Sequence, residues 1–342
     1  METARAIGWG ILGFGWVAQD YMAPAIAAAG DRLVAIADPD ERARAVAAEA
    51  GVAAYADEAD LLRDPAVEAV YVATPNHLHA DAVERIAASG RAILCEKPMA
   101  TTVPDAERMA EACRRSGVFY GTAFDQRHHP AHLAIRDAIA AGWIGRPAAV
   151  RIVYACWVGP DWSAGDAREN WRIDAAKAGG GALIDLAPHG LDLVAFLLGE
   201  PLTRVAALTQ SRVQDYAVDD GAALIGTTQS GALASLHVAY NCPEALPRRR
   251  LEIVGSAGMI VAENTMGQTP GGTVVLLDGA SGARTALPVA EPELSPFTGQ
   301  VRAFSRALSS GDRSAFSIEG DLHTMRLTEQ AYAAAAAASA AR

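Results

Sequence analysis

A glycine-punctuated stretch near the start of the chain, AIGWGILGFGWVA at residues 6–18, constrains the fold more than any other feature. An apolar run ends at Leu12 and is followed by Gly13, Gly15 and Ala18, and then by Ala-rich sequence. A buried strand, a tight turn and a helix have this pattern. The first glycine permits the turn, the second lets the backbone approach a pyrophosphate, and the small third residue lets the helix pack closely. The sequence therefore predicts a dinucleotide phosphate site at a helix N-terminus.

The sequence after this turn alternates short apolar runs with Ala-rich amphipathic segments. The run at 33–37 ends in Asp38, where an acid can accept hydrogen bonds from ribose hydroxyls. Further strands are expected at 67–73, 92–95 and 118–123, with helices at 41–50, 58–63, 80–89 and 104–116. The alternation predicts a parallel sheet covered on both faces, in which ligands bind at the carboxyl ends of the strands.

The pattern changes after a helix at 131–141 and a turn at 144–147. The strand-like runs beyond it are joined by glycine and polar turns, which predicts a mostly antiparallel sheet. They lie at 148–157, 202–211, 222–226, 232–240, 250–254, 259–262 and 273–277. One apolar helix is expected at 182–198, and two more near 298–308 and 320–341.

Composition limits the classes of protein to which the chain can belong. At 342 residues it exceeds the usual size of one domain, so two domains are expected. The formal charge of −11 disfavours binding to nucleic acid or to an anionic membrane. Four scattered cysteines without a CxxC pair indicate a reducing compartment. Because no apolar run approaches the length of a membrane span, and the N-terminal run suits a strand better than a secretion signal, we expect a cytoplasmic protein.

Lys97 is the first candidate for chemistry. It follows an apolar strand within Glu96-Lys97-Pro98, at the predicted carboxyl end of that strand. A lysine there can hydrogen-bond a substrate hydroxyl and favour its deprotonation, or polarise a carbonyl in the reverse direction. A surface lysine in a turn is the alternative, but Pro98 restricts the preceding backbone to an extended conformation and so aims the side chain.

Asp185 and His189 are the second candidates, because residues four apart share one face of a helix. Asp192 lies a further three residues along, roughly on the same face. Histidine exchanges protons near neutral pH, and a neighbouring carboxylate can orient it. A purely structural histidine is the alternative, although charge buried on an otherwise apolar helix needs a partner. Because proline is tolerated in the first turn of a helix but not in its interior, Pro188 leaves open that the helix begins later than Ala182.

Other chemistries lack their motifs. His77, His79, His128 and His129 could add ligands to a metal, but no HExxH motif supports such a site and we expect no metal. The chain has neither the GxSxG elbow of a hydrolase nor the GxxxxGK[ST] loop of phosphate transfer.

Taken together, these motifs resemble the glucose–fructose oxidoreductase/inositol dehydrogenase/MocA (Gfo/Idh/MocA) family over nearly the whole chain. The EKP element and the D-x-G-x-H element are hallmarks of that family. The matching segments are GFGWVA at 13–18, TPNHLH at 74–79, CEKPMA at 95–100, DQRHHP at 125–130, GWIGRP at 142–147, WR at 171–172, GGG at 179–181 and D-x-A-x-H-x-x-D at 185–192.

The resemblance implies an α/β architecture with a Rossmann NAD(P)-binding domain at 1–125. It implies a C-terminal α+β domain at 126–342 for substrate binding and oligomerisation, whose large, mostly antiparallel open sheet would join a homodimer or homotetramer. The C-terminal helix could pack back on the Rossmann domain. A cis peptide before Pro98 is common in the family.

The resemblance also implies roles for individual residues. Lys97, Asp185 and His189 would be catalytic and would contact the substrate together with Arg172. Cofactor contacts are implied for Gly13, Phe14, Gly15, Trp16, Val17, Asp38, Thr74, Pro75, Asn76, His79, Glu96, Lys97, Gln126, Trp171 and Arg172.

Two departures from the family pattern affect these expectations. Ala187 stands where the family usually has glycine, which could shift the start of the helix. Asp38-Pro39 replaces the Ser-Arg pair of NADP-preferring members. An acid at this position accepts from ribose hydroxyls and repels a 2′-phosphate, so NAD is favoured over NADP, although Arg42 lies close enough to weaken that preference.

The expected reaction is reversible hydride transfer between nicotinamide and a carbinol carbon of a sugar, glycoside or inositol-like polyol. Within the family, the segment 264–276 faintly resembles 1,5-anhydrofructose reductases, which leaves a sugar reductase as one alternative. A non-catalytic NAD-sensing regulator is the alternative from another class, and a lyase or epimerase that uses NAD transiently is a third.

Overall fold

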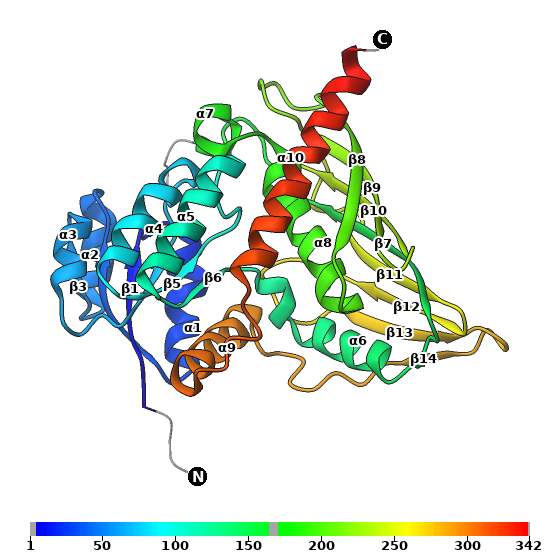
Figure 1. Cartoon of the computed structure of the whole chain (residues 1–342), viewed down its shortest axis with the longest axis horizontal. Coiled ribbons are helices and arrows are strands. Elements are labelled where there is room, and N and C mark those ends of the chain that lie inside the picture. The colour runs from blue at the N-terminus through cyan, green and yellow to red at the C-terminus, as the bar shows by residue number, and fades with distance from the viewer. Residues whose placement is uncertain (1–4, 164–169, 341–342) are drawn as a thin grey trace. The chain divides into compact units, whose positions relative to one another are not determined.

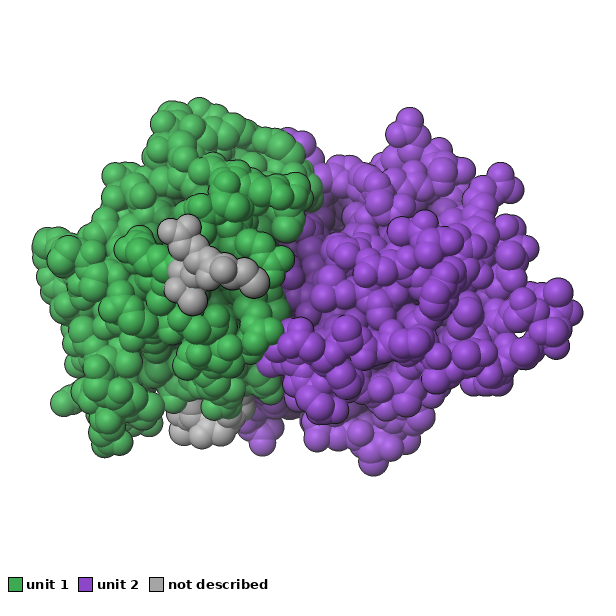
Figure 2. All heavy atoms as spheres, turned by 90° about the horizontal axis from the view of Figure 1, so that it is seen from below, with its two compact units in different colours: residues 1–123, 163–169, 297–322 green, residues 124–162, 170–296, 323–342 purple. Residues whose placement is uncertain are grey.

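The computed structural model describes residues 5–163 and 170–340, which form two compact units (Figure 2). Of the described residues, the first unit holds 5–123, 163 and 297–322, and the second holds 124–162, 170–296 and 323–340. The border at 123 lies close to the expected one at 125. Segment 297–322, however, belongs to the first unit although it lies far beyond that border.

The first unit is built on a six-stranded parallel sheet in the order β3-β2-β1-β4-β5-β6 (Figure 1). This order is that of a dinucleotide-binding Rossmann fold, so the predicted fold class of this half is confirmed. The strands are β1 (Gly8–Leu12), β2 (Arg32–Ala37), β3 (Ala53–Tyr55), β4 (Ala69–Val72), β5 (Ala92–Cys95) and β6 (Tyr120–Thr122).

Helices connect these strands as the alternation predicted. They are η1 (Ala18–Met22), α1 (Ala23–Ala28), α2 (Glu41–Glu49), α3 (Glu58–Arg63), η2 (Asn76–Leu78), α4 (His79–Ala88) and α5 (Val103–Ser116). Gly117 ends α5 in the left-handed conformation, which glycine adopts without steric cost.

An aromatic cluster holds the returning segment in the first unit. Phe304, from α9 (Pro296–Ser310), lies with its ring centroid 5.2 Å from that of Trp9 and 4.6 Å from that of Phe119. All three side chains are buried in one core. The contacts join Phe304 to residues 295 and 185 positions earlier in the chain, which no local sequence pattern could have indicated.

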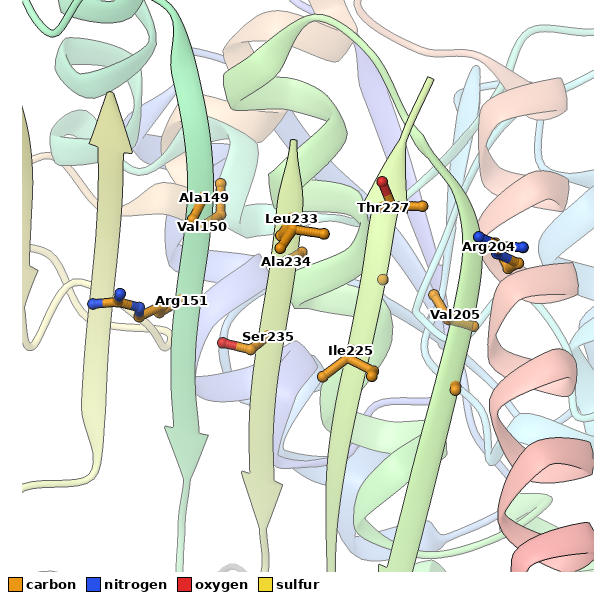
Figure 3. Close-up of a pocket in the computed structure, with 12 residues that line it drawn as sticks. Ala149, Val150, Arg151, Arg204, Val205, Ile225, Thr227, Leu233, Ala234 and Ser235 are labelled. Atoms are coloured by element: carbon orange, nitrogen blue, oxygen red, sulfur yellow. The ribbon is translucent and has the colours of Figure 1, made fainter. Parts of the chain in front are cut away.

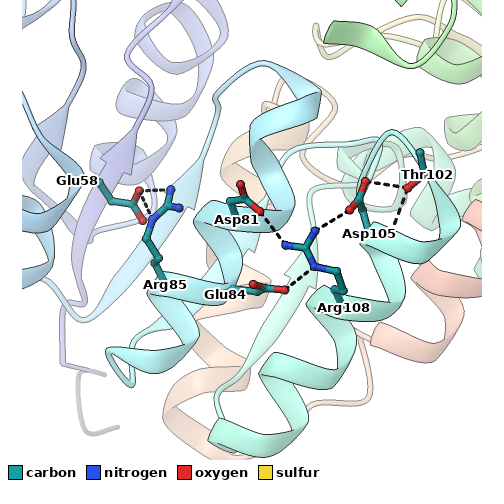
Figure 4. Close-up of polar contacts among 7 residues, drawn as sticks. All are labelled: Glu58, Asp81, Glu84, Arg85, Thr102, Asp105 and Arg108. Carbon is teal, nitrogen blue, oxygen red and sulfur yellow. Dashed lines mark hydrogen bonds and ion pairs between the residues drawn. The ribbon is translucent and has the colours of Figure 1, made fainter. Parts of the chain in front are cut away.

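Ion pairs lie on the exposed surface of α4 and α5 (Figure 4). Arg108 of α5 contacts Asp81 at 2.7 Å, Glu84 at 2.9 Å and Asp105 at 2.9 Å. Arg108 is nearly half exposed, so each pair contributes no more than about 1 kcal/mol. The buried apolar faces of α4 and α5, rather than this network, therefore hold the two helices against the sheet.

The second unit contains an eight-stranded sheet in the order β14-β13-β12-β11-β7-β10-β9-β8. Every pairing is antiparallel except that of β7 with β10, which confirms the predicted, mostly antiparallel sheet. The strands are β7 (Pro147–Ala155), β8 (Leu202–Gln210), β9 (Gly221–Thr228), β10 (Leu233–Ala239), β11 (Arg249–Gly255), β12 (Gly258–Glu263), β13 (Thr273–Asp278) and β14 (Arg284–Ala286).

Helix α8 (Ala182–Leu198) lies across one face of this sheet (Figure 1) and begins where the sequence predicted, with Pro188 inside it. Its first turn is anchored by the Asp219 carboxylate, which accepts from the backbone N–H groups of Gly181 at 3.0 Å and Leu183 at 2.8 Å. Tyr332 of α10 (Ile318–Ala340) donates to the same carboxylate at 2.9 Å. A Cβ atom on Gly181 would collide with the Asp219 backbone, which explains why glycine precedes this helix.

The stretch Ala175–Leu198 is long and apolar enough to cross a bilayer, but 78% of its most apolar window is buried inside the protein. It contains two helices, α7 (Ala175–Ala178) and α8, and the apolar side chains of α8 belong to the core of the second unit. The second unit also contains η3 (Asp125–His128), α6 (Pro130–Ala140) and η4 (Trp171–Ile173).

Three buried histidines lie together on η3 and α6. Burial lowers the pKa of His128 to about 3, of His129 to about 4 and of His132 to about 3. His132 Nδ1 contacts the carbonyl oxygen of Gln126 at 2.8 Å, and its Nε2 contacts the Thr265 hydroxyl at 3.1 Å. The three rings are therefore neutral in the folded protein near neutral pH.

These histidines make the free energy of unfolding depend on pH. Their folded pKa values lie below the unfolded value near 6.5, so the unfolded chain binds more protons below that pH and stability falls as the pH drops from about 6.5 towards 4. Each ring contributes at most about 1.4 kcal/mol per pH unit.

We expect His132→Gln to reduce the slope of the free energy of unfolding against pH, measured by urea unfolding, by about that amount. His77→Gln, at an exposed position of η2, should leave the slope unchanged; equal slopes for wild type and His132→Gln would contradict the assignment.

Candidate active site

The glycine-rich turn lies at the carboxyl edge of the parallel sheet. Gly13 has φ +85°, and a Cβ atom there would approach the Ala73 carbonyl carbon and oxygen to 2.8 Å. Its N–H donates to the Ala37 carbonyl oxygen at 2.8 Å, so the turn is tied to the end of β2. Only glycine fits this conformation and this space, as the sequence predicted.

The segment after the turn is helical but locally widened. Gln19 Nε2 donates to the Phe14 carbonyl at 2.6 Å, and Gln19 N donates to the Gly15 carbonyl at 2.9 Å. A π-turn occupies η1 immediately before Pro24, which has no N–H to donate to the preceding turn. The Phe14 ring is buried, while Trp16 and Val17 are half-buried, so any contact between Phe14 and a cofactor would come through its backbone.

Asp38 follows β2, as predicted, but its carboxylate is turned inward. The residue is 2% exposed. Its Oδ2 accepts from Phe14 N at 2.7 Å, and its Oδ1 accepts from Asp40 N at 2.8 Å. The carboxylate therefore ties the glycine-rich turn to the β2–α2 loop. A ribose hydroxyl held by Asp38 would share this carboxylate with the two backbone donors.

The loop between β4 and α4 is braced by a fully buried imidazole. The two ring nitrogens of His79 lie 3.0 Å from the carbonyl oxygens of Thr74 and Pro98. Burial lowers the pKa of His79 and keeps the ring neutral, so it donates to one carbonyl at a time. Any effect of His79 on a cofactor would thus pass through these neighbours. Pro75 and Asn76 continue the loop, and the buried Thr74 hydroxyl has no hydrogen-bond partner within the described part of the chain.

Lys97 follows β5 and precedes a cis peptide bond to Pro98, as the resemblance implied. The Tyr71 hydroxyl donates to Glu96 Oε1, while Lys97 N donates to Glu96 Oε2 at 3.2 Å. The Glu96 carboxylate therefore fixes the backbone from which the half-buried Lys97 side chain extends.

In the second unit, helix α8 brings Asp185 and His189 to one face and other elements supply their partners. Tyr240 donates to Asp185 Oδ2 at 2.6 Å. His189 Nδ1 lies 3.4 Å from Asp125 Oδ1, and the ring is packed edge-on against Tyr154 with centroids 5.6 Å apart. The second unit thus places an imidazole near two carboxylates in a largely buried setting.

Two further predicted residues have structural partners inside this unit. Asp192, expected roughly on the face of His189, is fully buried and forms an ion pair with Arg127, whose Nε lies 2.7 Å from Oδ2. Gln126 is also buried, and its Nε2 donates to the Gly267 carbonyl and to Asp125 Oδ2, both at 2.9 Å. The contact of Gln126 with a cofactor remains a prediction.

Arg172 lies on η4 between two indole rings. Its guanidinium carbon is 4.4 Å from the Trp171 ring centroid and 5.0 Å from that of Trp162. Such stacking fixes the planar guanidinium and leaves its N–H edge able to bind oxygen atoms.

The sequence offered little sign of Tyr71, Tyr154 and Tyr240, which hold or contact the charged groups. Each lies in an apolar strand or at its end, where the sequence pattern predicts that a tyrosine only packs in the hydrophobic core. Their partners are 25 to 55 residues away in the cases of Tyr71 and Tyr240, so only the folded sheets reveal the pairs. Within the described residues, no group of three or more His, Cys, Asp or Glu side chains is arranged to hold a metal ion.

Comparison with known proteins agrees with this arrangement. Residues 7–124 match a family described as oxidoreductases with an NAD-binding Rossmann fold, and residues 132–261 match the Gfo/Idh/MocA C-terminal domain. The chain is 32% identical over 332 residues to 1,5-anhydro-D-fructose reductase of Ensifer adhaerens, covering 95% of this chain and 97% of the relative. It is 28% identical over 295 residues to myo-inositol 2-dehydrogenase of Thermotoga maritima, covering 84% of each.

Among solved structures, aldose-aldose oxidoreductase from Caulobacter crescentus, complexed with glycerol, matches with a TM-score of 0.88. The identity is 26%, and 98% of each chain is covered. All three of these proteins are named as reductases, dehydrogenases or oxidoreductases of sugars or polyols.

Proposed function

The chain belongs to the Gfo/Idh/MocA oxidoreductase family, and we propose that it transfers a hydride reversibly between a nicotinamide cofactor and a carbon of a sugar, glycoside or cyclic polyol. The observation that carries the proposal is the position of Asp185 and His189 one turn apart on α8, in a chain that also has Lys97 at the carboxyl end of β5. A non-catalytic NAD-sensing protein would need none of these three side chains.

The edge of the parallel sheet fits a dinucleotide. Gly13 leaves the turn free of a Cβ atom at its closest approach to the β4–α4 loop, and the unpaired Thr74 hydroxyl lies buried in that same loop. Gly13, Gly15 and Asp38 would hold the pyrophosphate and the adenosine ribose. When bound, the nicotinamide ring supplies the carbon that accepts or donates hydride.

We assign the proton chemistry to the protein. In the oxidation direction, Lys97 hydrogen-bonds the reacting hydroxyl and favours its deprotonation, and His189 takes the proton. Asp185, held by Tyr240, orients the substrate or the imidazole. Arg172 would bind further substrate oxygens through its fixed guanidinium.

The first test is a substrate panel followed by cofactor absorbance at 340 nm. 1,5-Anhydro-D-fructose is the first substrate to try, because the relative that acts on it covers nearly the whole chain. Myo-inositol, D-xylose and D-glucose follow in the oxidation direction, each with NAD and with NADP. Cofactor binding without turnover of any of them would favour the regulator, and isomerised or eliminated product without net NADH would favour a lyase or epimerase.

Lys97 is expected to act in turnover rather than in cofactor binding. It and Lys177 are the only lysines in a sequence with 29 lysines and arginines. Lys97→Ala should lower kcat by at least ~100-fold, because a positioned group that assists proton transfer is lost, while the NADH dissociation constant changes little. Lys177→Ala is the matched control. Turnover by Lys97→Ala at the wild-type rate would remove Lys97 from the mechanism.

The preference for NAD over NADP rests on two acids in the loop after β2. Asp38 is buried, so the more exposed Asp40 carries the charge closest to solvent. Asp40 caps α2 and contacts the Arg42 guanidinium at 3.0 Å. Arg42 is thus engaged by a carboxylate next to the position proposed for the ribose, which weakens its use for a 2′-phosphate.

Asp40→Asn should therefore relax the preference for NAD. Asparagine keeps an oxygen for the helix cap but removes the negative charge, so the KM for NADPH should fall by about 10-fold while the KM for NADH changes by no more than about 2-fold. Glu41→Gln, which removes a neighbouring exposed charge, is the matched control. An unchanged ratio of the two KM values would refute the role of Asp40.

We further propose that the open face of the eight-stranded sheet joins two copies of the chain. Ile225 of β9 and Leu233 of β10 are 66% and 61% exposed on this face, and Figure 3 shows them on neighbouring strands. Arg151 on the same face is paired with Glu252 at 3.1 Å. Because this pair neutralises local charge, two identical faces can meet without repulsion despite the net charge of −11.

The double substitution Ile225→Lys with Leu233→Lys should convert the oligomer to a monomer. Light scattering coupled to size exclusion measures the mass, and circular dichroism checks that the fold is kept. Val46→Lys, at an exposed apolar position of α2, should leave the mass unchanged. A monomeric wild type, or a double variant of wild-type mass, would contradict this interface.

The cysteines bear on the cellular compartment. Cys95, Cys113, Cys156 and Cys242 are all free. Burial raises the pKa of Cys113 to about 12 and that of Cys95 well above its usual range, so neither is a reactive thiolate at neutral pH. Free thiols persist in reducing surroundings, and we therefore assign the protein to the cytoplasm.

A further inference from the structure

The carboxylate of Asp125 faces the proposed proton-exchanging ring from a different element. Asp125 Oδ1 lies 3.4 Å from His189 Nδ1, and each side chain is 6% exposed. Asp125 is on η3, whereas His189 is on α8, so the pair is made by the fold of the second unit and not by helical spacing. Two groups buried this deeply and this close affect each other's charge strongly.

A chain of hydrogen bonds fixes the orientation of Asp125. Its Oδ2 accepts from Gln126 Nε2 at 2.9 Å. The same Gln126 amide donates to the Gly267 carbonyl at 2.9 Å, and its Oε1 accepts from Gly267 N at 3.2 Å. Because Gln126 holds Oδ2, the other oxygen, Oδ1, is the one directed at the ring of His189.

Several other ionisable groups on the elements around His189 are paired or neutral, while Arg249 and Arg172 add positive charge near Tyr154 and Tyr240. Asp192, one turn along α8, is neutralised by Arg127 of η3. Asp185, one turn earlier, accepts from Tyr240 after β10. Burial raises the pKa of Tyr154 on β7 and of Tyr240 well above 10, so both phenols are neutral. His128 of η3 is neutral too, since its pKa is about 3.

We propose that Asp125 is the positioning residue of His189: the charge of its carboxylate, 3.4 Å from Nδ1, favours the tautomer with the proton on Nδ1, in which Nε2 exchanges the substrate proton. This inference rests on the proposed function and adds to it a residue that acts only through the histidine. Gln126 in turn acts through Asp125.

The proton balance of the step is simple. In the oxidation direction the substrate O–H proton moves to His189 Nε2, the hydride leaves the same carbinol for the nicotinamide, and a carbonyl forms. The imidazolium that results keeps its Nδ1 proton, and the Asp125 carboxylate offsets the new positive charge without itself becoming protonated. In the reduction direction the imidazolium returns the Nε2 proton to the oxygen.

The first experiment measures pH–rate profiles of Asp125→Asn in both directions, with 1,5-anhydro-D-fructose and NADH or NADPH for reduction and with the product for oxidation. Asparagine keeps the size of the side chain but removes the charge that favours the imidazolium. The limb of each profile that reports the histidine should move to lower pH by about 1 unit or more, and kcat should fall by about 10-fold or more, while the KM for the cofactor is kept.

Asp137→Asn is the matched control, because Asp137 is exposed on α6 and pairs with Arg136. It should leave the profiles unchanged. If Asp125→Asn lowers the rate uniformly without moving either limb, Asp125 has only a structural role and the inference is overturned.

A second experiment does not depend on turnover. Nitrogen-15 labelling of the histidines, with His189→Gln to assign the signal, shows which ring nitrogen of His189 carries the proton. We expect Nδ1–H in the wild type and a titration midpoint that moves to lower pH in Asp125→Asn. An Nε2–H tautomer in the wild type, or an unmoved midpoint in the variant, overturns the inference.

The two experiments separate the two proposals. If the wild type converts no sugar or polyol in the panel, the proposed function fails, and the nitrogen spectra still decide whether Asp125 sets the tautomer of His189. If the wild type is active but the spectra show no effect of Asp125, only the present inference fails.

Discussion

The register of the parallel sheet is the constraint on which the first half of the site depends. Leu12 pairs with Val72, and Val72 pairs with Cys95, so β1, β4 and β5 end at one level. The loops that follow are bonded to the neighbouring strand ends, since Ala73 N donates to the Leu12 carbonyl and Glu96 N to the Val72 carbonyl. A one-residue slip would turn Thr74 or Lys97 towards the opposite face of the sheet. Backbone pairing, rather than side-chain contacts, therefore aligns the cofactor turn with the lysine.

In the second unit the site depends on buried polar side chains of α8 that are paired with groups from other elements. Helix α8 is apolar over most of its length, yet it carries Asp185, His189 and Asp192. Each has a polar partner from another element: Tyr240, Asp125 and Arg127, respectively. An unpaired charge at such a position would be strongly destabilising, so the partners stabilise the fold as well as shaping the site. The same buried setting would strengthen the proposed action of the Asp125 carboxylate, which lies 3.4 Å from the imidazole of His189.

Local patterns predicted much of this structure because local rules produced it. Helices α3 and α8 and strand β5 begin and end where the sequence indicated, at glycine caps, acidic N-caps and apolar runs. The return of segment 297–322 to the first unit was not predictable in this way, since it depends on Phe304 packing against Trp9 and Phe119. The short edge strand β14 was likewise missed, because its three residues are all exposed and carry no alternation. Among the candidate site residues, spacing predicted that Asp185 and His189 share one face of α8, whereas the tyrosines that hold Glu96 and Asp185 are far from them in sequence.

Arginine and lysine side chains occupy different kinds of position in this protein, and the difference is relevant to the proposed mechanism. Two arginines make fixed planar contacts: Arg127 forms a two-nitrogen contact with Asp192, and Arg172 stacks on Trp171 and Trp162. The arginine guanidinium stays charged at every accessible pH and suits fixed, planar contacts. An amine is a compact donor on a flexible stem, which suits a group that approaches a single oxygen atom. In a sequence with only two lysines, one of them lies at the carboxyl end of β5, and arginine there would present a wide, planar fork instead of a single donor.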